Sequence, residues 1–203
     1  MTSVLQFSFP PVPRRRQQQQ QPILASADRQ ALFSRIAPVY DNVTGLDFSR
    51  EQLQIASSRQ NIQSKACYRN LKWVEGDALD LPFSDCYFDA ITMGYGLRNV
   101  IDKYKAMKEV YRVLKPGSKA SILDFNKSTD EFRTSIQGWM IDNIVVPVAA
   151  GYGLSKEYQY LKSSIQEFLT GEELEHLALK AGFSSAKHFE VGGGLMGNLV
   201  ATR

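Results

Sequence analysis

The chain has 203 residues, of which 43% are hydrophobic and 22% are charged, and its formal net charge is +3. These values are typical of one soluble globular domain with a short additional segment. They argue against a nucleic-acid partner, because the adjacent arginines Arg14–Arg16 account for the whole basic excess. No metal site is expected, since the two cysteines, Cys67 and Cys86, have no metal-binding spacing and there are only two histidines.

The first 27 residues differ in composition from the rest of the chain. They contain no Asp or Glu, and they include Arg14–Arg16, the glutamine run Gln17–Gln21 and four prolines. Such a basic leader is typical of an organelle transit peptide, and equally of a disordered tail without a targeting role. Composition alone leaves both interpretations open. We therefore divide the chain into a leader, residues 1–27, and a domain, residues 28–203.

Hydrophobic periodicity and capping residues predict helices and strands that alternate along the domain. This alternation indicates an α/β protein with a mostly parallel sheet covered on both faces. The last two predicted strands are expected to form an antiparallel hairpin. Helices are predicted over Asp28–Tyr40, Arg50–Arg59, Lys103–Leu114, Glu131–Val146 and from Thr170 to Gly182, and strands over Val43–Leu46, Leu71–Val74, Phe88–Met93, Lys119–Phe125, Lys187–Val191 and Leu195–Thr202.

A glycine-rich stretch, Gly192–Gly197, matches the dinucleotide-binding pattern GxGxxG in form only. That pattern binds phosphate where it follows a strand and opens a helix. Only six residues follow Gly197, which leaves no room for such a helix. We therefore interpret this stretch as a hairpin turn.

Several short motifs together resemble the ubiquinone/menaquinone biosynthesis C-methyltransferase family. The resemblance covers roughly residues 30–203 and is strongest for the plant plastid branch, which acts on a phytylated naphthoquinol. It implies a Rossmann-like sheet, S-adenosylmethionine (SAM) as methyl donor, a prenylated naphthoquinol as substrate, and a chloroplast location with residues 1–27 as the transit peptide. The motifs are Gly76–Ala78, Leu81–Phe83, Phe88–Asp89, Gly96–Val100, Arg112–Gly117, Tyr160–Ile165 and Ala181–Phe183, with Ala37–Asp41 upstream.

The resemblance also implies roles for residues that follow predicted strands. Asp47 would bind the SAM ribose, Asp77 and Ala78 the adenine, and Gly94 would line the cofactor, since ligands of open α/β sheets bind at the carboxyl ends of strands. Tyr95–Asn99 would face the quinone.

The catalytic base is not identified, and the weak candidates are Asp124, Arg98 and Tyr95. Two of these candidates have other interpretations. Arg98 is also compatible with a surface ion pair. Asp124 is compatible with orienting the substrate, with acting as a base and with holding a loop.

One departure from the family pattern is large. In relatives, a helix, the first strand and a glycine-rich turn separate the motif that ends at Asp41 from the acidic strand end, whereas here only Asn42–Thr44 separate Asp41 from Gly45. We interpret this as an internal deletion. It predicts two strands with exposed edges, no cradle for the carboxypropyl end of SAM, and weak SAM binding. The alternative function is therefore a non-catalytic truncated isoform.

The segment Trp139–Leu154 is apolar and contains aromatic residues and glycine. The resemblance implies a lid over a lipid-tailed quinone, and an amphipathic segment of this kind also suits contact with a membrane surface. Packing in the core explains the same composition equally well.

Overall fold

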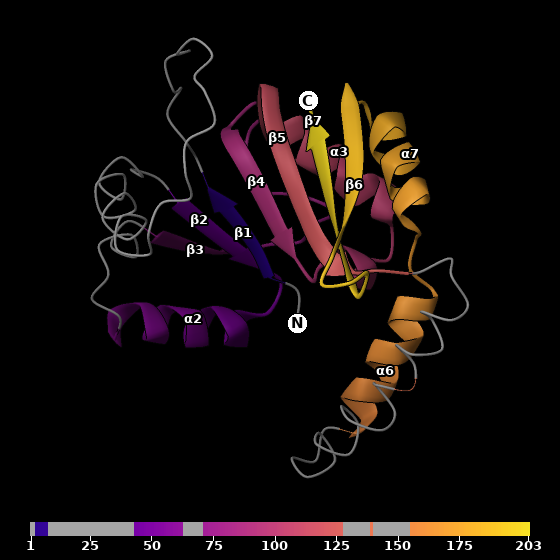
Figure 1. Cartoon of the computed structure of the whole chain (residues 1–203). Helices are drawn as coiled ribbons and strands as arrows, with labels where there is room; N and C mark the ends of the chain where they lie inside the picture. The colour runs from indigo at the N-terminus through magenta and orange to yellow at the C-terminus, as the bar shows by residue number, and fades with distance from the viewer. Residues whose placement is uncertain (1–2, 8–42, 63–70, 128–138, 140–154) are drawn as a thin grey trace, which may run out of the picture.

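The computed structural model describes residues 3–7, 43–62, 71–127, 139 and 155–203, which form a seven-stranded sheet with helices beside it (Figure 1). The sheet order is β3-β2-β1-β4-β5-β7-β6. The strands are β1 Ser3–Phe7, β2 Val43–Asp47, β3 Leu71–Glu75, β4 Phe88–Gly94, β5 Leu114–Phe125, β6 Ser185–Val191 and β7 Met196–Thr202, and the helices are α2 Arg50–Ile62, η3 Leu97–Asn99, α3 Lys103–Val113, α6 Ser155–Gln166 and α7 Gly171–Ala181.

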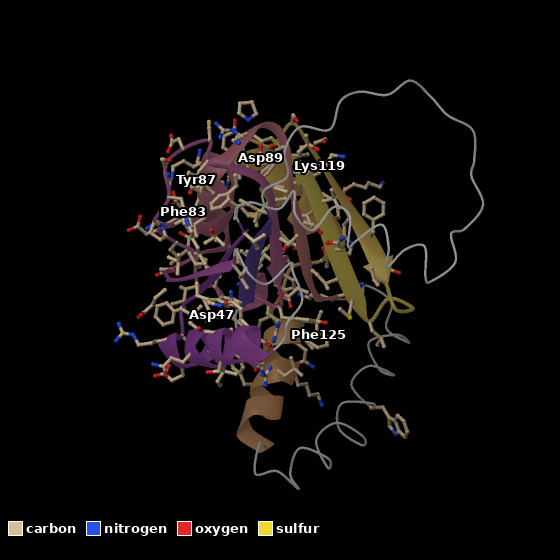
Figure 2. The ribbon with its side chains drawn as sticks, turned by 90° about the vertical axis from the view of Figure 1, so that its left-hand side faces the viewer. Asp47, Phe83, Tyr87, Asp89, Lys119 and Phe125 are labelled. Carbon is tan, nitrogen blue, oxygen red and sulfur yellow. The ribbon has the colours of Figure 1, made fainter. Side chains whose placement is uncertain are left out.

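The carboxyl ends of β2, β3, β4 and β5 all lie along the same end of the sheet, which we call the carboxyl edge. The pairs β2–β3 and β4–β5 are parallel, while β1 is antiparallel to both β2 and β4. β7 is antiparallel to β5 and β6. The strands β2, β3, β4, β5 and β6 therefore all run in the same direction, as in a mostly parallel sheet. Because β1 and β7 run in the opposite direction, four of the six neighbouring pairs are antiparallel. In Figure 2, Asp47 and Phe125 lie towards this carboxyl edge, and Asp89 and Lys119 lie towards the opposite edge.

The expectation that β2 and β4 would have unpaired edges was wrong. The position between them is filled by β1, which comes from the leader and pairs along its length with β2 and with β4. A strand position inside a sheet leaves two rows of backbone donors and acceptors to satisfy, and any extended segment of the chain can satisfy them. Within the leader, Ser3–Phe7 is therefore a strand of the sheet, while residues 8–27 lie outside the described part.

The core of the described chain lies between the sheet and two helices. In α3, Met107 and Val110 are buried, as the helical periodicity predicts, and they share one apolar cluster with Phe88 of β4. In Figure 1, α3 and α7 lie beside each other on one face of the β4–β6 half. This half thus has a continuous core that holds β4 and β5 in place.

Both ends of α7 follow the predicted capping pattern. The Thr170 side chain accepts a hydrogen bond from the Glu173 backbone N–H, and the Glu173 carboxylate accepts one from the Thr170 N–H. Gly182 ends the helix with a φ of +115°. A side chain at this φ would be strained, so glycine is the residue expected there.

The residues Lys115–Gly117, which lie between the predicted helix and the predicted strand, are part of β5. The strand begins at Leu114, and Gly117 within it has a φ of +78°. The register against β4 shifts between Phe88 and Ala90. The Lys-Pro-Gly sequence therefore ends the helix as expected but leaves the chain extended, with a local irregularity in place of a separate turn.

The hairpin of β6 and β7 is confirmed, and its turn contains Gly192, Gly193 and Gly194, all with positive φ. The GxGxxG-like sequence is thus a turn. The helices predicted over Asp28–Tyr40 and Glu131–Val146 lie outside the described residues, as does the segment Trp139–Leu154 apart from Trp139, which is exposed.

Candidate functional site

The carboxyl edge brings together residues from strands that are distant in sequence. Asp47 at the end of β2 is paired with Glu75 of β3 on one side and with Ser3 of β1 on the other. Ser3 is in turn paired with Gly94 at the end of β4. Asp47 and Gly94 are therefore two strand spacings apart, roughly 10 Å, with the amino end of β1 between them.

The Asp47 carboxylate is fixed at the turn from β2 to α2. The side chain is buried, and its Oδ1 atom accepts a hydrogen bond of 2.8 Å from the Ser49 backbone N–H. Ser49 Oγ accepts from the Gln52 N–H at 3.3 Å, as expected of a residue that caps α2. The local sequence thus holds one carboxylate at the edge of the sheet in a defined orientation.

An open hollow of about 770 Å³ lies between the turns that follow β2 and β3. Ligand pockets usually have roughly 300–1,000 Å³. At its rim, the Arg50 Nε atom donates to the Glu75 carboxylate at 2.8 Å, and both side chains are largely exposed. The hollow is lined by Phe48, Ser49, Arg50, Glu51, Glu75, Gly76 and Asp77.

Asp77 and Ala78 lie in the turn after β3. Asp77 Oδ1 accepts a hydrogen bond of 2.9 Å from the Leu79 N–H, and Ala78 is buried. The turn starts with Gly76, where an added Cβ would lie 2.9 Å from the Leu46 Cδ1 atom. A larger residue at this position would push the Leu46 side chain aside, so glycine favours the close approach of this turn to β2 that keeps Asp77 beside the hollow.

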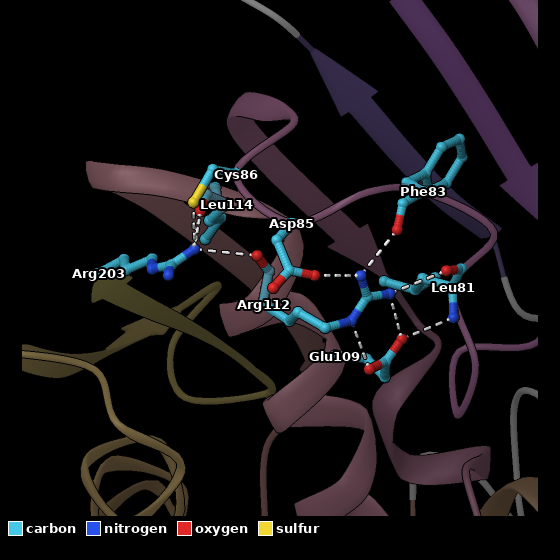
Figure 3. Close-up of polar contacts among 8 residues, drawn as sticks. All are labelled: Leu81, Phe83, Asp85, Cys86, Glu109, Arg112, Leu114 and Arg203. Carbon is cyan, nitrogen blue, oxygen red and sulfur yellow. Dashed lines mark hydrogen bonds and ion pairs between the residues drawn. The ribbon is translucent and has the colours of Figure 1, made fainter.

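Arg112, the first residue of the motif Arg112–Gly117, organises the next loop (Figure 3). Arg112 of α3 donates to the backbone carbonyls of Leu81 and Phe83 and forms ion pairs with Glu109 and Asp85. The hydrogen bond from Arg112 is the main cause that lowers the pKa of the Glu109 carboxyl, with burial opposing it. Arg112 thus anchors the loop that follows Asp77 and Ala78 to the core helix.

Arg98 and Asp124 form a buried ion pair at the carboxyl end of β5. The Arg98 Nη1 atom donates to Asp124 Oδ1 at 2.7 Å, and only 8% of the arginine side chain and 3% of the aspartate side chain are exposed. Asp124 also accepts from the backbone N–H groups of Arg98 and Phe125. Arg98 lies over the Phe125 ring. The surface ion pair considered for Arg98 is therefore wrong, because both charges lie inside the protein.

Tyr95 has a strained backbone and an accessible side chain. Its φ is +55°, unusual for a bulky residue. Its carbonyl accepts hydrogen bonds from Arg98 Nη1 at 3.0 Å and Asn99 Nδ2 at 3.2 Å, and its N–H donates to the Leu123 carbonyl. The residue is 37% exposed. Tyr95 is thus the exposed member of the three catalytic candidates.

Helix α6 contacts the same loop through two polar side chains. The Tyr160 hydroxyl donates to Asn99 Oδ1 at 3.2 Å, and Arg98 Nε donates to Ser164 Oγ at 3.3 Å. Tyr160 and Ser164 are four residues apart, so they share one face of the helix. In the sequence, this segment stands out only as a family motif. The i, i+4 spacing of two hydrogen-bonding side chains was the available signal for their contact with the loop.

The structure therefore arranges the predicted residues in two groups. Asp47, Asp77 and Ala78 lie in and beside the turns that bound the hollow, and Gly94 lies across β1 from Asp47. Tyr95, Arg98 and Asp124 form the second group, next to α6.

Comparison with known proteins agrees with these features. Residues 20–203 match the profile of the ubiE/COQ5 methyltransferase family. The chain belongs to this family. It is 63% identical over 178 residues to the chloroplastic 2-phytyl-1,4-beta-naphthoquinone methyltransferase of Arabidopsis thaliana, covering 88% of this chain and 68% of that protein. It is 45% identical over 161 residues to a 2-phytyl-1,4-naphtoquinone methyltransferase of a Nostoc species, covering 79% of this chain and 69% of that protein.

A solved structure shares the fold of this methyltransferase. A SAM-dependent methyltransferase from Aquifex aeolicus superposes with a TM-score of 0.58 at 16% identity, covering 85% of this chain and 74% of that one. This likeness supports the expected Rossmann-like methyltransferase fold.

The chemistry of the edge fits one end of SAM. The Asp47 and Asp77 carboxylates and the buried backbone at Ala78 suit the hydroxyls and amine of an adenosine, and the exposed Phe48 ring offers an apolar surface to a base. Between the carboxyl ends of β2 and β4, β1 presents its amino end, Ser3. The carboxyl end of β1 lies at the opposite edge, beside Val43.

Two other classes of site are absent from residues 3–7, 43–62, 71–127, 139 and 155–203. No group of three His, Cys, Asp or Glu side chains is arranged to hold a metal ion. In the same part of the chain, no helix combines the length and the hydropathy that crossing a bilayer requires.

Proposed function

We propose that this protein transfers a methyl group from SAM to a ring carbon of a phytylated naphthoquinol, a step in phylloquinone biosynthesis. The observation that carries the proposal is the 63% identity to the Arabidopsis enzyme over 88% of this chain. The carboxylates and the glycine at the carboxyl edge support it, because ligands of open α/β sheets bind there. The alternative of a non-catalytic isoform is not favoured by the comparisons.

In this proposal, the adenosine end of SAM occupies the hollow beside β2 and β3. Asp47 accepts hydrogen bonds from the ribose hydroxyls, and Asp77 with Ala78 contacts the adenine. Gly94 lets the backbone of β4 approach the cofactor closely. When bound, SAM supplies an electrophilic methyl group on a sulfonium. The residues of the chain contribute mainly by positioning, since the methyl carbon and the attacking carbon must be aligned at roughly 3–3.5 Å.

The substrate side is assigned to the loop Tyr95–Asn99. Asp124 is not accessible to a substrate, since its side chain is 3% exposed and its two oxygens already accept three hydrogen bonds within the protein. We therefore assign Arg98 and Asp124 to holding the loop. Tyr95, whose side chain is accessible, is assigned to orienting the quinol hydroxyl. The base itself is not identified.

The location of the protein is part of the same proposal. The relative from Arabidopsis is chloroplastic, which supports a plastid location for this chain. A lipid-tailed substrate favours peripheral contact with a membrane surface, for which Trp139–Leu154 is the proposed segment.

The test is a pair of measurements on the full chain. Calorimetric titration with SAM measures cofactor binding, and methyl transfer to reduced 2-phytyl-1,4-naphthoquinone measures activity. Asp47→Asn keeps the acceptor for Ser49 but removes the charge, so we expect SAM affinity to fall about tenfold or more. Asp89→Asn, at the opposite edge, is the matched control and should bind SAM normally. Absence of methyl transfer by a folded chain that binds SAM would refute the proposed substrate.

The sequence-based prediction of weak SAM binding is tested by the same titration. Binding in the micromolar range would contradict it and would mean that the edge serves SAM without a glycine-rich turn after its central strand. Absence of heat from a folded chain would favour the non-catalytic isoform.

A further inference from the structure

The strand β1 links the two halves of the sheet. On one side of it lie β2 and β3 with α2 below them, and on the other side lie β4, β5, β7 and β6 (Figure 1). Within the sheet, β2 pairs only with β1 and β3, and β4 pairs only with β1 and β5. The two groups of site residues stand on opposite sides of this link. Asp47 belongs to the first half, and Gly94 and Tyr95 belong to the second.

The pairing of β1 is continuous on both sides. Against β2 it runs from Ser3 opposite Asp47 to Phe7 opposite Val43, and against β4 from Ser3 opposite Gly94 to Gln6 opposite Ile91. Without β1, the facing edges of β2 and β4 would each present a row of unpaired backbone groups. All five residues of β2 are buried, as are Phe88, Ile91 and Met93 of β4. Unpaired backbone in such surroundings is costly.

We propose that the gap between β2 and β4 is a binding site for an extended peptide segment, and that Ser3–Phe7 of the same chain is its ligand. The mode of binding is strand addition, in which main-chain hydrogen bonds on the two edges supply the affinity. The site accepts about five residues, the length over which β1 is paired with β2.

The antiparallel direction favours this occupant. Phe7 lies opposite Val43, so the chain leaves β1 and enters β2 at the same edge of the sheet. An antiparallel connection of this kind needs no crossover, whereas a parallel strand in the gap would require the chain to pass over a face of the sheet. The leader therefore reaches the gap by folding back on β2.

The proposal gives the leader a structural role that conflicts with its removal. A transit peptide that comprises residues 1–27 contains β1, so its cleavage would vacate the gap and separate Asp47 from Gly94. The leader must therefore stay attached for the carboxyl edge to remain assembled.

Cross-linking in the full chain tests the assignment of the ligand. Leu5 and Thr92 are directly opposite each other in β1 and β4. Such partners in an antiparallel pair have Cα atoms about 4.5–5.5 Å apart, within the range of a disulfide. In a background with Cys67 and Cys86 changed to serine, Leu5→Cys with Thr92→Cys should form an intramolecular disulfide, detected by mass spectrometry.

The matched control pairs Thr92→Cys with Gln18→Cys, a leader position outside β1, and should cross-link much more slowly. Equal cross-linking in both variants would overturn the proposal, because it would reflect random collision of the leader with the sheet. Cross-links found only between two copies would also overturn it, since they would make a second chain the ligand.

Hydrogen exchange supplies a second readout. Leu5→Pro in the full chain removes a ladder donor from β1, so amides of β2 and β4 should exchange at least about tenfold faster. Gln18→Pro should leave these rates unchanged. Unchanged protection of residues 43–47 in Leu5→Pro would contradict the proposal. Neither measurement requires SAM or substrate. A negative result would therefore overturn the role of β1 without bearing on the proposed methyl transfer.

Discussion

The Arg98 guanidinium lies 2.7 Å from the Asp124 carboxylate, and both side chains are almost completely buried. The pair joins the loop after β4 to the end of β5, and Ser164 of α6 is hydrogen-bonded to the same guanidinium. The loop after β4 is thus held to both β5 and α6 through one ion pair. In its low-dielectric surroundings, each charge is stable only while the other is present.

The first prediction concerns this pair. Arg98→Met or Asp124→Asn alone should lower the free energy of unfolding by about 3–5 kcal/mol, because each leaves a buried partner uncompensated. The double variant should lose clearly less than the sum of the two single losses. Urea denaturation of the four proteins measures this coupling. As a control, Glu75→Gln breaks an exposed ion pair and should leave the unfolding midpoint unchanged. Additive losses for Arg98 and Asp124 would show that the pair is not coupled.

The second prediction concerns the phenol of Tyr95. Tyr95→Phe keeps the ring and loses, within the protein, only the exposed hydrogen bond from the hydroxyl to the Met196 Sδ atom, so the stability should change little while kcat falls roughly tenfold or more through loss of the hydrogen bond to the substrate. Steady-state kinetics with the reduced quinone measures this. Tyr111→Phe, at a partly buried tyrosine that packs against Phe183, is a matched control that should keep its kcat. An unchanged kcat for Tyr95→Phe would remove the hydroxyl from the mechanism.

The third prediction concerns the anchoring of the loop that follows Ala78. Arg112→Lys keeps the charge but loses the planar fork that reaches Leu81, Phe83 and Glu109 at once. We expect a loss of about 2 kcal/mol in the free energy of unfolding, since the Phe83 carbonyl loses its Arg112 donor and the Leu81 carbonyl keeps the hydrogen bond from the Phe83 N–H but loses the one from Arg112. Thermal and urea unfolding measure it. Asp85→Asn, at the exposed end of the same network, should have no measurable effect. If Arg112→Lys is as stable as the unchanged protein, a single positive charge is enough to anchor the loop and the prediction is wrong.

The fourth prediction concerns His188 and pH. Burial lowers the pKa of the His188 imidazole, while the charges of Glu175 and Glu190 act in the opposite direction. The unfolded chain therefore binds this proton more tightly than the folded chain. The contribution of neutral His188 to the free energy of unfolding is complete above the ordinary pKa of 6.5. It is lost as the pH falls from 6.5 towards the lowered pKa of the folded protein.

This loss can be measured by urea denaturation between pH 8 and about pH 5. The unfolding midpoint of the unchanged protein should fall over this range, and the fall should be smaller in His188→Gln, which does not titrate. The ring of His188 packs against Gly171 and Gly197, so the variant is compared with itself across pH and not with the parent at one pH. Parallel pH profiles for the two proteins would contradict the prediction.

Sequence patterns were sufficient wherever the determining interactions are local. The capping box of Thr170 and Glu173, the positive φ at Gly182 and the hairpin turn at Gly192–Gly194 all depend on neighbours within a few residues. The buried face of α3 follows from helical periodicity alone. The positions of Asp47 and Asp77 at strand ends were predictable for the same reason, because the strands themselves were.

Burial of Arg98 was not predictable in this way. Its partners Asp124 and Ser164 are 26 and 66 residues away in sequence. Whether a charge is exposed or paired inside the protein depends on which elements pack around it, and no local pattern carries that information.

By itself, the sequence determined the family, the alternation of helices and strands, and the residues at the carboxyl ends of β2, β3 and β4. Only the tertiary structure decided what fills the centre of the sheet. Ser3–Phe7 has no local feature that selects this role, and it pairs with β2 about 40 residues and with β4 about 90 residues further along the chain. The physical reason is that backbone hydrogen bonding between strands depends on an available edge and not on side-chain identity, so a gap between two strands selects its occupant through the whole fold.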